Sequence, residues 1–229
     1  MAIPPGGERA ATALGVYEAQ GNRASILFFV CGPRTRELSE LREGDHLAVS
    51  GPLGNGFTFT NARHVAIVAG GVGIASVLLP AQHLVRKGIR TQLYYGARTA
   101  RLLVEMERFA AEGCEIVCAT DDGSFGRPGF VTEALAEARE KPDLILACGP
   151  SPMLRATAAV AAKLGVPAQV SLEETFACGV GGCWGCVVPI DRASAQAPGF
   201  PGPGEGGSDV VYARVCKEGP VFWAHELRW

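Results

Sequence analysis

The chain has 229 residues, of which 48% are hydrophobic and 19% are charged, which suffices for one large or two small domains with their own cores. The formal net charge is −2 and no run of Lys or Arg occurs, so a nucleic-acid-binding protein is not expected. Eight cysteines are present, but a chain of this length and apolar content does not need a disulfide framework. We therefore expect the protein to be located in a reducing cytoplasm.

The first residues lack the charged start and the apolar stretch of a signal peptide. Residues 65–81 are uncharged, as in a membrane span, but glycines at 70–73 and Pro80 interrupt them. We interpret this stretch as a buried strand, a glycine turn and a helix. The sequence therefore predicts a soluble protein without a membrane-spanning segment.

Residues 1–63 are predicted to form short strands. Strand-like runs at 24–30 and 46–49 are separated by turn-rich pieces, which favours fragments of a small antiparallel barrel. So few residues make a thin barrel, and we expect one flank to expose strand edges or to face a partner.

Strand and helix signals alternate regularly over residues 64–170. The predicted strands are 65–69, 91–95, 115–119, 144–148 and 168–170. The predicted helices are 75–86, 102–111, 132–139 and 152–163. This alternation predicts an α/β domain with a doubly wound parallel sheet, whose ligands bind at the carboxyl ends of the strands.

A glycine turn follows the first of these strands. Gly70, Gly71 and Gly73 would let a pyrophosphate approach the following helix. A full dinucleotide fingerprint also needs Gly or Ala where Ser76 stands, and an acid near the end of the second strand, where none occurs. The alternative is a glycine-lined turn that only packs helix on strand.

Other candidates at strand ends are ambiguous. Asp121 and Asp122 fit a ribose contact or a solvated turn, and Cys148 fits a nicotinamide contact or a small buried side chain. Arg98 does not decide between NAD and NADP. The four histidines form no cluster and no G-x-S-x-G elbow occurs, which argues against hydrolase chemistry.

Four cysteines near the C-terminal side have the spacing of plant-type [2Fe–2S] ligands. Cys178, Cys183 and Cys186 form C-x4-C-x2-C, and Cys216 follows at a distance. Glycines between them would let the backbone turn its amides toward the sulfurs. The alternatives are a zinc site or reactive surface thiols.

The remaining cysteines, Cys31, Cys114, Cys118 and Cys148, lie in apolar, strand-like runs, and we expect them to be small buried residues. Between the third and fourth ligand candidates, residues 189–209 are rich in Gly and Pro, which predicts a mobile excursion.

Six short motifs follow one another along the chain: GPLGNGF at 51–57, AGGVGI at 69–74, TDDGS at 120–124, ACGP at 147–150, SLEE at 171–174 and RVCKEGPVF at 214–222. Together with the cysteine spacing, they resemble the electron-transfer subunit of class 1B dihydroorotate dehydrogenase, within the ferredoxin reductase superfamily. The resemblance runs from about residue 24 to the end.

This resemblance implies a partial FAD-binding barrel at 1–63, an NAD-binding domain at 64–170 and a [2Fe–2S] module at 171–229. It implies an oxidoreductase subunit of pyrimidine biosynthesis that passes electrons from NADH through FAD and the cluster to an FMN-containing catalytic subunit, in a heterotetramer of two copies of each. The family's N-terminal Arg-x-aromatic/aliphatic-Ser motif has no arginine or serine counterpart near Met1, so we expect a truncated barrel that lacks part of the FAD grip. Either the start was cut upstream, or a partner completes the pocket, or FAD is held weakly or not at all.

The resemblance also assigns residues, none of them a separate catalytic group. Those expected to border FAD are Gly32, Thr35, Gly51, Pro52, Leu53, Gly54, Gly56 and Phe57. Those expected to contact NAD or a neighbouring cofactor are Gly70, Gly71, Gly73, Asp122, Cys148, Gly149 and Glu174. The expected cluster ligands are Cys178, Cys183, Cys186 and Cys216. Two further hypotheses remain: a cluster-bearing adaptor without its own FAD, and an NAD(P)H reductase subunit for another flavoenzyme.

Overall fold

The computed structural model describes residues 2–3, 12–59, 61–193 and 209–229. Its centre is a seven-stranded sheet in the order β13-β10-β9-β5-β6-β7-β8. The strands in this order are β13 (Val221–Trp223), β10 (Ala168–Ser171), β9 (Leu144–Cys148), β5 (His64–Gly70), β6 (Arg90–Ala97), β7 (Glu115–Thr120) and β8 (Arg127–Pro128). All neighbours are parallel except β13, which runs antiparallel to β10. The predicted α/β fold with a doubly wound parallel sheet is confirmed.

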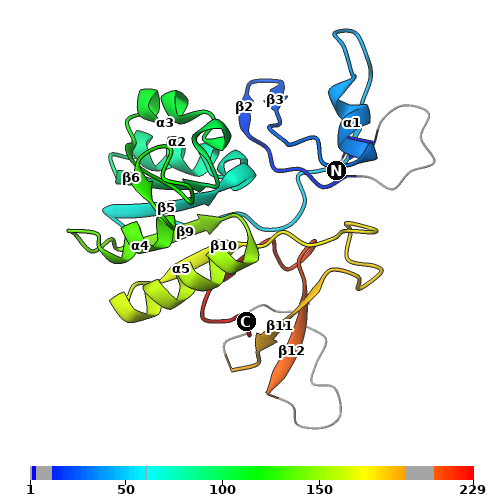
Figure 1. The fold of residues 1–229 in the computed structure, drawn as a ribbon. Coiled ribbons are helices and arrows are strands. Elements are labelled where there is room, and N and C mark those ends of the chain that lie inside the picture. The colour runs from blue at the N-terminus through cyan, green and yellow to red at the C-terminus, as the bar shows by residue number, and fades with distance from the viewer. Residues whose placement is uncertain (1, 4–11, 60, 194–208) are drawn as a thin grey trace.

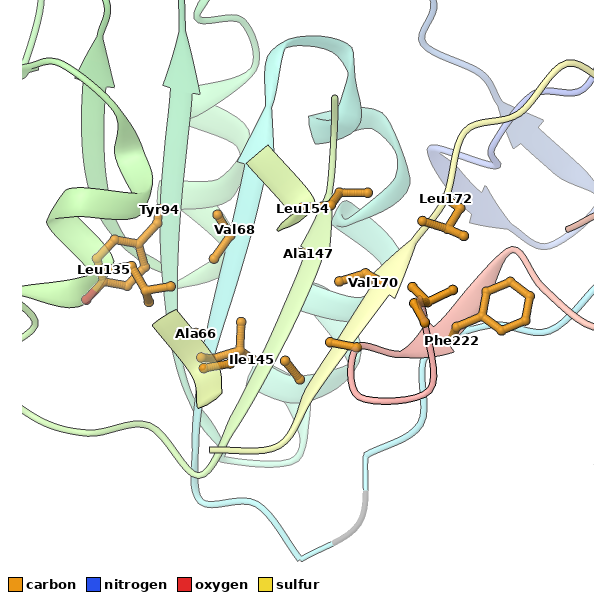
Figure 2. Packing of buried hydrophobic residues seen from close by; sticks show 14 of the residues in the cluster. Ala66, Val68, Tyr94, Leu135, Ile145, Ala147, Leu154, Val170, Leu172 and Phe222 are labelled. Carbon is orange, nitrogen blue, oxygen red and sulfur yellow. The ribbon is translucent and has the colours of Figure 1, made fainter. Parts of the chain in front are cut away.

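Both faces of the sheet are buried, because its strands are apolar at consecutive positions. On β5, Ala66 and Val68 face one core, which Figure 2 shows beside Leu135 and Leu154. The alternate residues of β5 face a second core. Helices therefore cover both faces: α4 (Val131–Ala136) and α5 (Ser151–Leu164) cover one, and α2 (Leu78–Arg86) and α3 (Met106–Glu112) cover the other.

The five predicted strands of residues 64–170 all form, each within two residues of its expected bounds. The helix boundaries differ more. The predicted 75–86 helix is a 3-10 segment, η1 (Gly71–Ser76), followed by α2. The predicted 102–111 helix begins later, because a 3-10 turn, η2 (Ala100–Leu102), precedes α3. The third helix ends three residues early, at Ala136.

The residues before β5 differ from the sequence prediction. The predicted strand at 24–30 is wrong beyond residue 25, because β3 (Arg23–Ser25) is short and, among the described residues, pairs only with β2 (Glu18–Gln20). The strand predicted at 46–49 shortens to β4 (Ala48–Val49), which pairs antiparallel with β1 (Ala2–Ile3). An unpredicted helix, α1 (Pro33–Ser39), begins with Pro at its first position, where a missing N–H costs nothing.

The segment after β10 forms an antiparallel ribbon of β11 (Val187–Asp191) and β12 (Val210–Arg214). The predicted excursion at 189–209 is therefore wrong at Pro189–Asp191, which lie in β11; its residues 194–208 lie outside the described residues. Figure 1 shows the β11–β12 ribbon and the strands β2 and β3 to the right of β5 and β6.

The last strand, β13, returns to the sheet, so Phe222 joins the α4–α5 core together with Cys186 and Cys216 (Figure 2 labels Phe222). The cysteine region is thereby anchored on the nucleotide sheet. No helix among the described residues is long and apolar enough to cross a membrane.

Candidate redox site

The carboxyl ends of β5 and β9 form the switch point of the sheet. Ala69 pairs with Cys148 across these parallel strands, and the chain continues toward opposite edges from them, to β6 and to β10. In doubly wound sheets, ligands bind in the crevice that this divergence leaves. The Gly70–Gly73 turn and Gly149, both predicted to contact NAD, therefore meet at the expected position.

Close backbone contact explains two glycines here. A Cβ on Gly73 would lie 2.2 Å from the carbonyl oxygen of Cys148, and one on Gly149 would lie 3.0 Å from Cα of Gly70. Gly71 has a left-handed φ of +52°, and a Cβ there would meet open space. The turn is thus tight against β9 and open on its outer side, which fits a pyrophosphate.

Tyr95, which the sequence analysis did not single out, holds this turn from β6. Its hydroxyl lies 3.2 Å from the carbonyl oxygen of Gly71 and 3.1 Å from that of Leu102, and it accepts a hydrogen bond from the Val104 amide. The ring is fully buried. A tyrosine in a buried strand gives no sequence signal for this contact, since its partners are backbone atoms.

Cys148 is buried, and desolvation raises the pKa of its thiol to about 11. It therefore stays a neutral thiol near pH 7. Cys114 is also buried, as expected, whereas Cys118 is only half-buried. The prediction for Cys31 is wrong, because it is exposed and precedes α1 outside any strand.

Two other predicted cofactor residues are Asp122, which has a hydrogen-bond partner in its own turn, and Glu174, which lies outside the glycine turn. Asp122 is exposed after β7, and its Oδ1 accepts the Ser124 amide at 3.0 Å and hydroxyl at 2.6 Å. These bonds lower the pKa of Asp122 and tie it to its own turn. Glu174 is exposed between β10 and the cysteine loop.

The first segment predicted to border FAD surrounds the start of α1. The Thr35 hydroxyl oxygen accepts the amides of Cys31 and Gly32 at 3.0 and 3.1 Å, so it caps this helix. A cavity of about 400 Å³ opens beside it. Its lining residues are Val30, Cys31, Gly32, Pro33, Arg36, Glu37 and Glu40.

The second predicted FAD segment, 51–57, contacts the turn after Cys216. The Asn55 amide donates to the Gly219 carbonyl at 2.6 Å, and its side chain donates to the Glu218 carbonyl at 2.9 Å. A Cβ on Gly54 would lie 2.4 Å from the same Gly219 oxygen. Within this segment Gly51, Pro52, Leu53 and Gly56 are exposed, and Phe57 packs on the α2–α3 core.

Gln169, buried on β10, fixes the chain just beyond this segment. Its side-chain amide exchanges two hydrogen bonds with the backbone of Thr58, at 2.8 and 2.9 Å. The predicted flavin segment is thus tied both to the sheet and to the cysteine region.

The four cysteines lie as two pairs. The Cys178 and Cys183 side chains interact with each other, and the Cys216 amide donates to Cys186 Sγ at 3.4 Å. The β11–β12 register produces the second pair, because Val187 opposes Arg214 and the Val215 amide bonds the Cys186 carbonyl. Residues 30 positions apart are thereby brought together.

Backbone amides point at the sulfurs. Cys178 Sγ accepts the amides of Gly182 at 3.3 Å and Cys183 at 3.4 Å. Hydrogen bonds from the backbone of Val180 and Cys183 lower the pKa of Cys178 to about 6, which favours the thiolate that iron binds. Burial instead raises the pKa of Cys216.

Within the described ranges, no three His, Cys, Asp or Glu side chains gather closely enough for a single metal ion. Two thiolate pairs suit a [2Fe–2S] cluster, in which two cysteines bind each iron, better than mononuclear zinc, which needs four ligands around one point. The donor set therefore fits the cluster. Cys178 and Cys183 form the more exposed pair, and Cys186 and Cys216 are buried.

Comparison with known proteins agrees with this arrangement. The family model of the oxidoreductase NAD-binding domain matches residues 67–159, and that of the iron–sulfur cluster binding domain of dihydroorotate dehydrogenase B matches residues 203–228. The dihydroorotate dehydrogenase B (NAD(+)) electron transfer subunit of Caldanaerobacter subterraneus subsp. tengcongensis is 39% identical over 93% of this chain and 78% of its own. The chain belongs to this family.

Other members of the family have similar sequence identity to this chain. The probable electron transfer subunit of Methanocaldococcus jannaschii is 36% identical over 86% of this chain and 69% of its own. Among solved structures, an NADH-dependent reduced ferredoxin-NADP oxidoreductase, studied for flavin-based electron bifurcation, superposes with a TM-score of 0.78. It is 32% identical and covers 94% of this chain and 73% of its own.

A more remote structure, the ferredoxin reductase of carbazole 1,9a-dioxygenase, has a TM-score of 0.56 at 24% identity over 67% of this chain and 51% of its own. At that identity the likeness concerns the fold alone. The family membership confirms the resemblance drawn from the motifs.

Proposed function

We propose that this chain is the electron-transfer subunit that links NAD(H), through FAD and a [2Fe–2S] cluster, to an FMN-containing dihydroorotate dehydrogenase subunit. The observation that carries the proposal is that four cysteines lie as two pairs, in a segment that β13 anchors on the nucleotide-binding sheet. When bound, flavin exchanges electrons in pairs with nicotinamide and singly with the cluster. The chain's own residues then have to hold three groups in order.

The parts divide this work as follows. Residues 1–63 hold FAD, residues 64–170 hold NAD(H), and residues 171–229 hold the cluster. The division is supported by the separate small sheets before β5, by the doubly wound sheet and by the β11–β12 ribbon. β13 makes the third part pack against the second, because it pairs with β10 and its Phe222 lies in the α4–α5 core.

At the nucleotide crevice, Gly71 and Gly73 admit the pyrophosphate, and Gly149 with Cys148 lines the nicotinamide end. The Cys148 thiol is buried behind this end of the crevice and stays neutral, so it adds no charge beside the ring. Asp122 and Glu174 are proposed as outer contacts, and Asp122 can accept a ribose hydroxyl on Oδ2 while Oδ1 stays bonded to Ser124.

At the flavin part, residues 32–35 and 51–57 are proposed to border FAD. Exposed apolar side chains suit contact with a flat ring system, and Val30, Val49 and Leu53 are exposed at 50%, 70% and 44%. Asn55 and Gly54 then set the separation between the flavin and the cluster, since they touch the turn that follows Cys216.

The partner is proposed to be the catalytic subunit, in a heterotetramer with two copies of each chain. Because the relatives' names give NAD(+) as oxidant, we infer that physiological electrons flow from the catalytic subunit to NAD⁺. The same groups carry electrons from NADH in reverse. A cytoplasmic location is supported by the cysteines, all eight of which are free and lie within the described residues.

A second candidate is a subunit of a different flavoenzyme. The observation that favours it is the TM-score of 0.78 to a reduced ferredoxin-NADP oxidoreductase. Fold and cofactors do not name the electron acceptor.

The deciding experiment combines this chain with its FMN-containing partner purified from the same source. We expect dihydroorotate-dependent NAD⁺ reduction that requires both chains and tracks the FAD and iron content of this one. Reduction of NAD⁺ from reduced ferredoxin, without dihydroorotate activity, would instead establish the second candidate. Absence of FAD with an intact cluster would indicate an adaptor.

A further inference from the structure

Arg214, at the end of β12, is the residue that ties the cysteine region together. Its Nη1–H donates to the Gly181 carbonyl at 2.7 Å. Its Nε–H and Nη2–H donate to the two carboxylate oxygens of Glu218, at 3.0 and 2.5 Å. The guanidinium also lies over the Trp184 ring, 4.6 Å from its centroid.

These contacts join the two halves of the cysteine set. Gly181 and Trp184 belong to the loop that carries Cys178, Cys183 and Cys186, whereas Glu218 belongs to the turn after Cys216. The Arg214 carbonyl closes that turn by accepting the amides of residues 217 and 218. One side chain thus links the loop to the turn.

The loop needs such support because its backbone is left-handed at a bulky residue, Trp184, as well as at Gly181, where glycine takes this conformation without strain. Gly181 has φ +84° and Trp184 has φ +57°. A bulky residue rarely takes this conformation unless its surroundings impose it. The cation–π contact between the guanidinium and the Trp184 ring stabilises this conformation.

The pair is also charged and largely shielded. The Arg214 and Glu218 side chains are only 11% and 12% exposed. Arginine keeps its charge at any ordinary pH, and water screens it little at such a position. Reduction adds one negative charge to a [2Fe–2S] cluster, so a nearby cation favours the reduced state and a nearby carboxylate opposes it.

We propose that Arg214 is the positioning residue of the cluster loop and that the Arg214–Glu218 pair sets the reduction potential of the cluster, with Glu218 offsetting the guanidinium charge. The inference rests on the proposed [2Fe–2S] function. Arg214 binds no iron itself. It acts through the backbone of Gly181, through Trp184 and through its charge.

The test compares Arg214→Gln, Arg214→Lys and Glu218→Gln with Arg127→Gln. The control removes Arg127 of β8, at the far edge of the sheet, whose half-buried side chain donates to Glu137 at 2.7 Å. For each anaerobically purified protein, iron and acid-labile sulfide are quantified, and the midpoint potential is measured by a redox titration followed by electron paramagnetic resonance.

We expect Arg214→Gln to lose cluster on purification and its remaining cluster to shift to a more negative potential. Glu218→Gln should shift in the positive direction, because the guanidinium charge is no longer offset. Arg214→Lys keeps the positive charge but loses the several N–H donors of the guanidinium. This variant should therefore bind less iron than the wild type, and its midpoint potential should shift less than that of Arg214→Gln. Arg127→Gln should match the wild type in both measurements.

Opposite signs for Arg214→Gln and Glu218→Gln distinguish a charge effect from simple loosening, which would move both variants the same way. If Arg214→Gln holds no cluster while its circular dichroism matches the control, the positioning role stands, and Glu218→Gln decides the potential. Full iron content with an unchanged potential in the Arg214 and Glu218 variants would overturn the inference. A wild-type protein without iron and sulfide would refute the proposed function instead.

Discussion

The backbone amide of Asn55 donates a hydrogen bond to the carbonyl oxygen of Gly219 at 2.6 Å, which joins the proposed flavin segment directly to the turn after the last cluster cysteine. The two residues are far apart in the chain, and their contact is reinforced by the Asn55 side chain on Glu218. Separation and orientation of redox groups depend on such contacts, so the contact offers a specific test.

Gly54→Ala is expected to disturb transfer between flavin and cluster. The new Cβ would lie 2.4 Å from the Gly219 oxygen, and φ at this position is +73°, so the loop has to move away. Stopped-flow mixing with NADH should show flavin bleaching at the wild-type rate and cluster reduction slowed at least several-fold. Gly44→Ala is the matched control, because φ there is also left-handed, at +95°, but a Cβ meets nothing within 4 Å. If flavin bleaching and cluster reduction were slowed equally, or if neither were slowed, Gly54 would have no specific role in transfer between flavin and cluster.

Gly73→Ala is expected to damage the nucleotide crevice more than Gly71→Ala. At Gly73 the added carbon meets the Cys148 backbone at 2.2 Å, whereas at Gly71 it meets open space and costs about 1 kcal/mol of backbone strain. Urea unfolding should show Gly71→Ala mildly destabilised and Gly73→Ala destabilised by clearly more. Similar behaviour of the two variants would argue against the tight packing of this turn on β9.

Cys148 predicts a loss of stability at alkaline pH. Burial raises its pKa from 9.0 to about 11, so the folded protein holds this proton more tightly than the unfolded chain does. The resulting stabilisation is complete below pH 9 and is lost as the pH rises to about 11. The stability advantage of the wild type over Cys148→Ala should therefore shrink by about 2 kcal/mol between pH 8 and pH 10.5. An advantage that stays constant over this range would contradict the buried neutral thiol.

Thiol reactivity outside the cluster loop should follow exposure. Cys31 is exposed, whereas Cys114 and Cys148 are buried with pKa values raised to about 11. After a short iodoacetamide pulse on the native protein, peptide mapping should find Cys31 modified and the other two modified only in denaturant. Rapid native labelling of Cys148 would mean that the crevice opens to solvent.

The sequence predicts the nucleotide sheet well because its strands are continuous apolar runs with turns between them, such as 65–69 and 144–148. Buried parallel strands leave little choice of structure. The start of the chain is predicted poorly. Residues 26–30 look like a strand by composition, yet they form no strand with any of the described residues, and β propensity needs a partner strand to be realised.

The cysteine spacing predicts the candidate cluster ligands, but not what supports them. Arg214 and Glu218 stand four residues apart around Cys216, which is a weak signal of an ion pair. Their contacts to Gly181 and Trp184 depend on the β11–β12 register, which sequence patterns do not give. Asn55 is likewise recognisable only within a motif, since its partner lies in a distant turn.

The central claim is that four thiolates hold a two-iron cluster, and the most direct measurement is chemical and magnetic analysis of the anaerobically purified protein. The account predicts two iron atoms and two acid-labile sulfides per chain, and a spin-½ paramagnetic resonance signal after dithionite reduction that disappears in Cys186→Ser. One zinc ion per chain without sulfide, or an unchanged signal in Cys186→Ser, would contradict it.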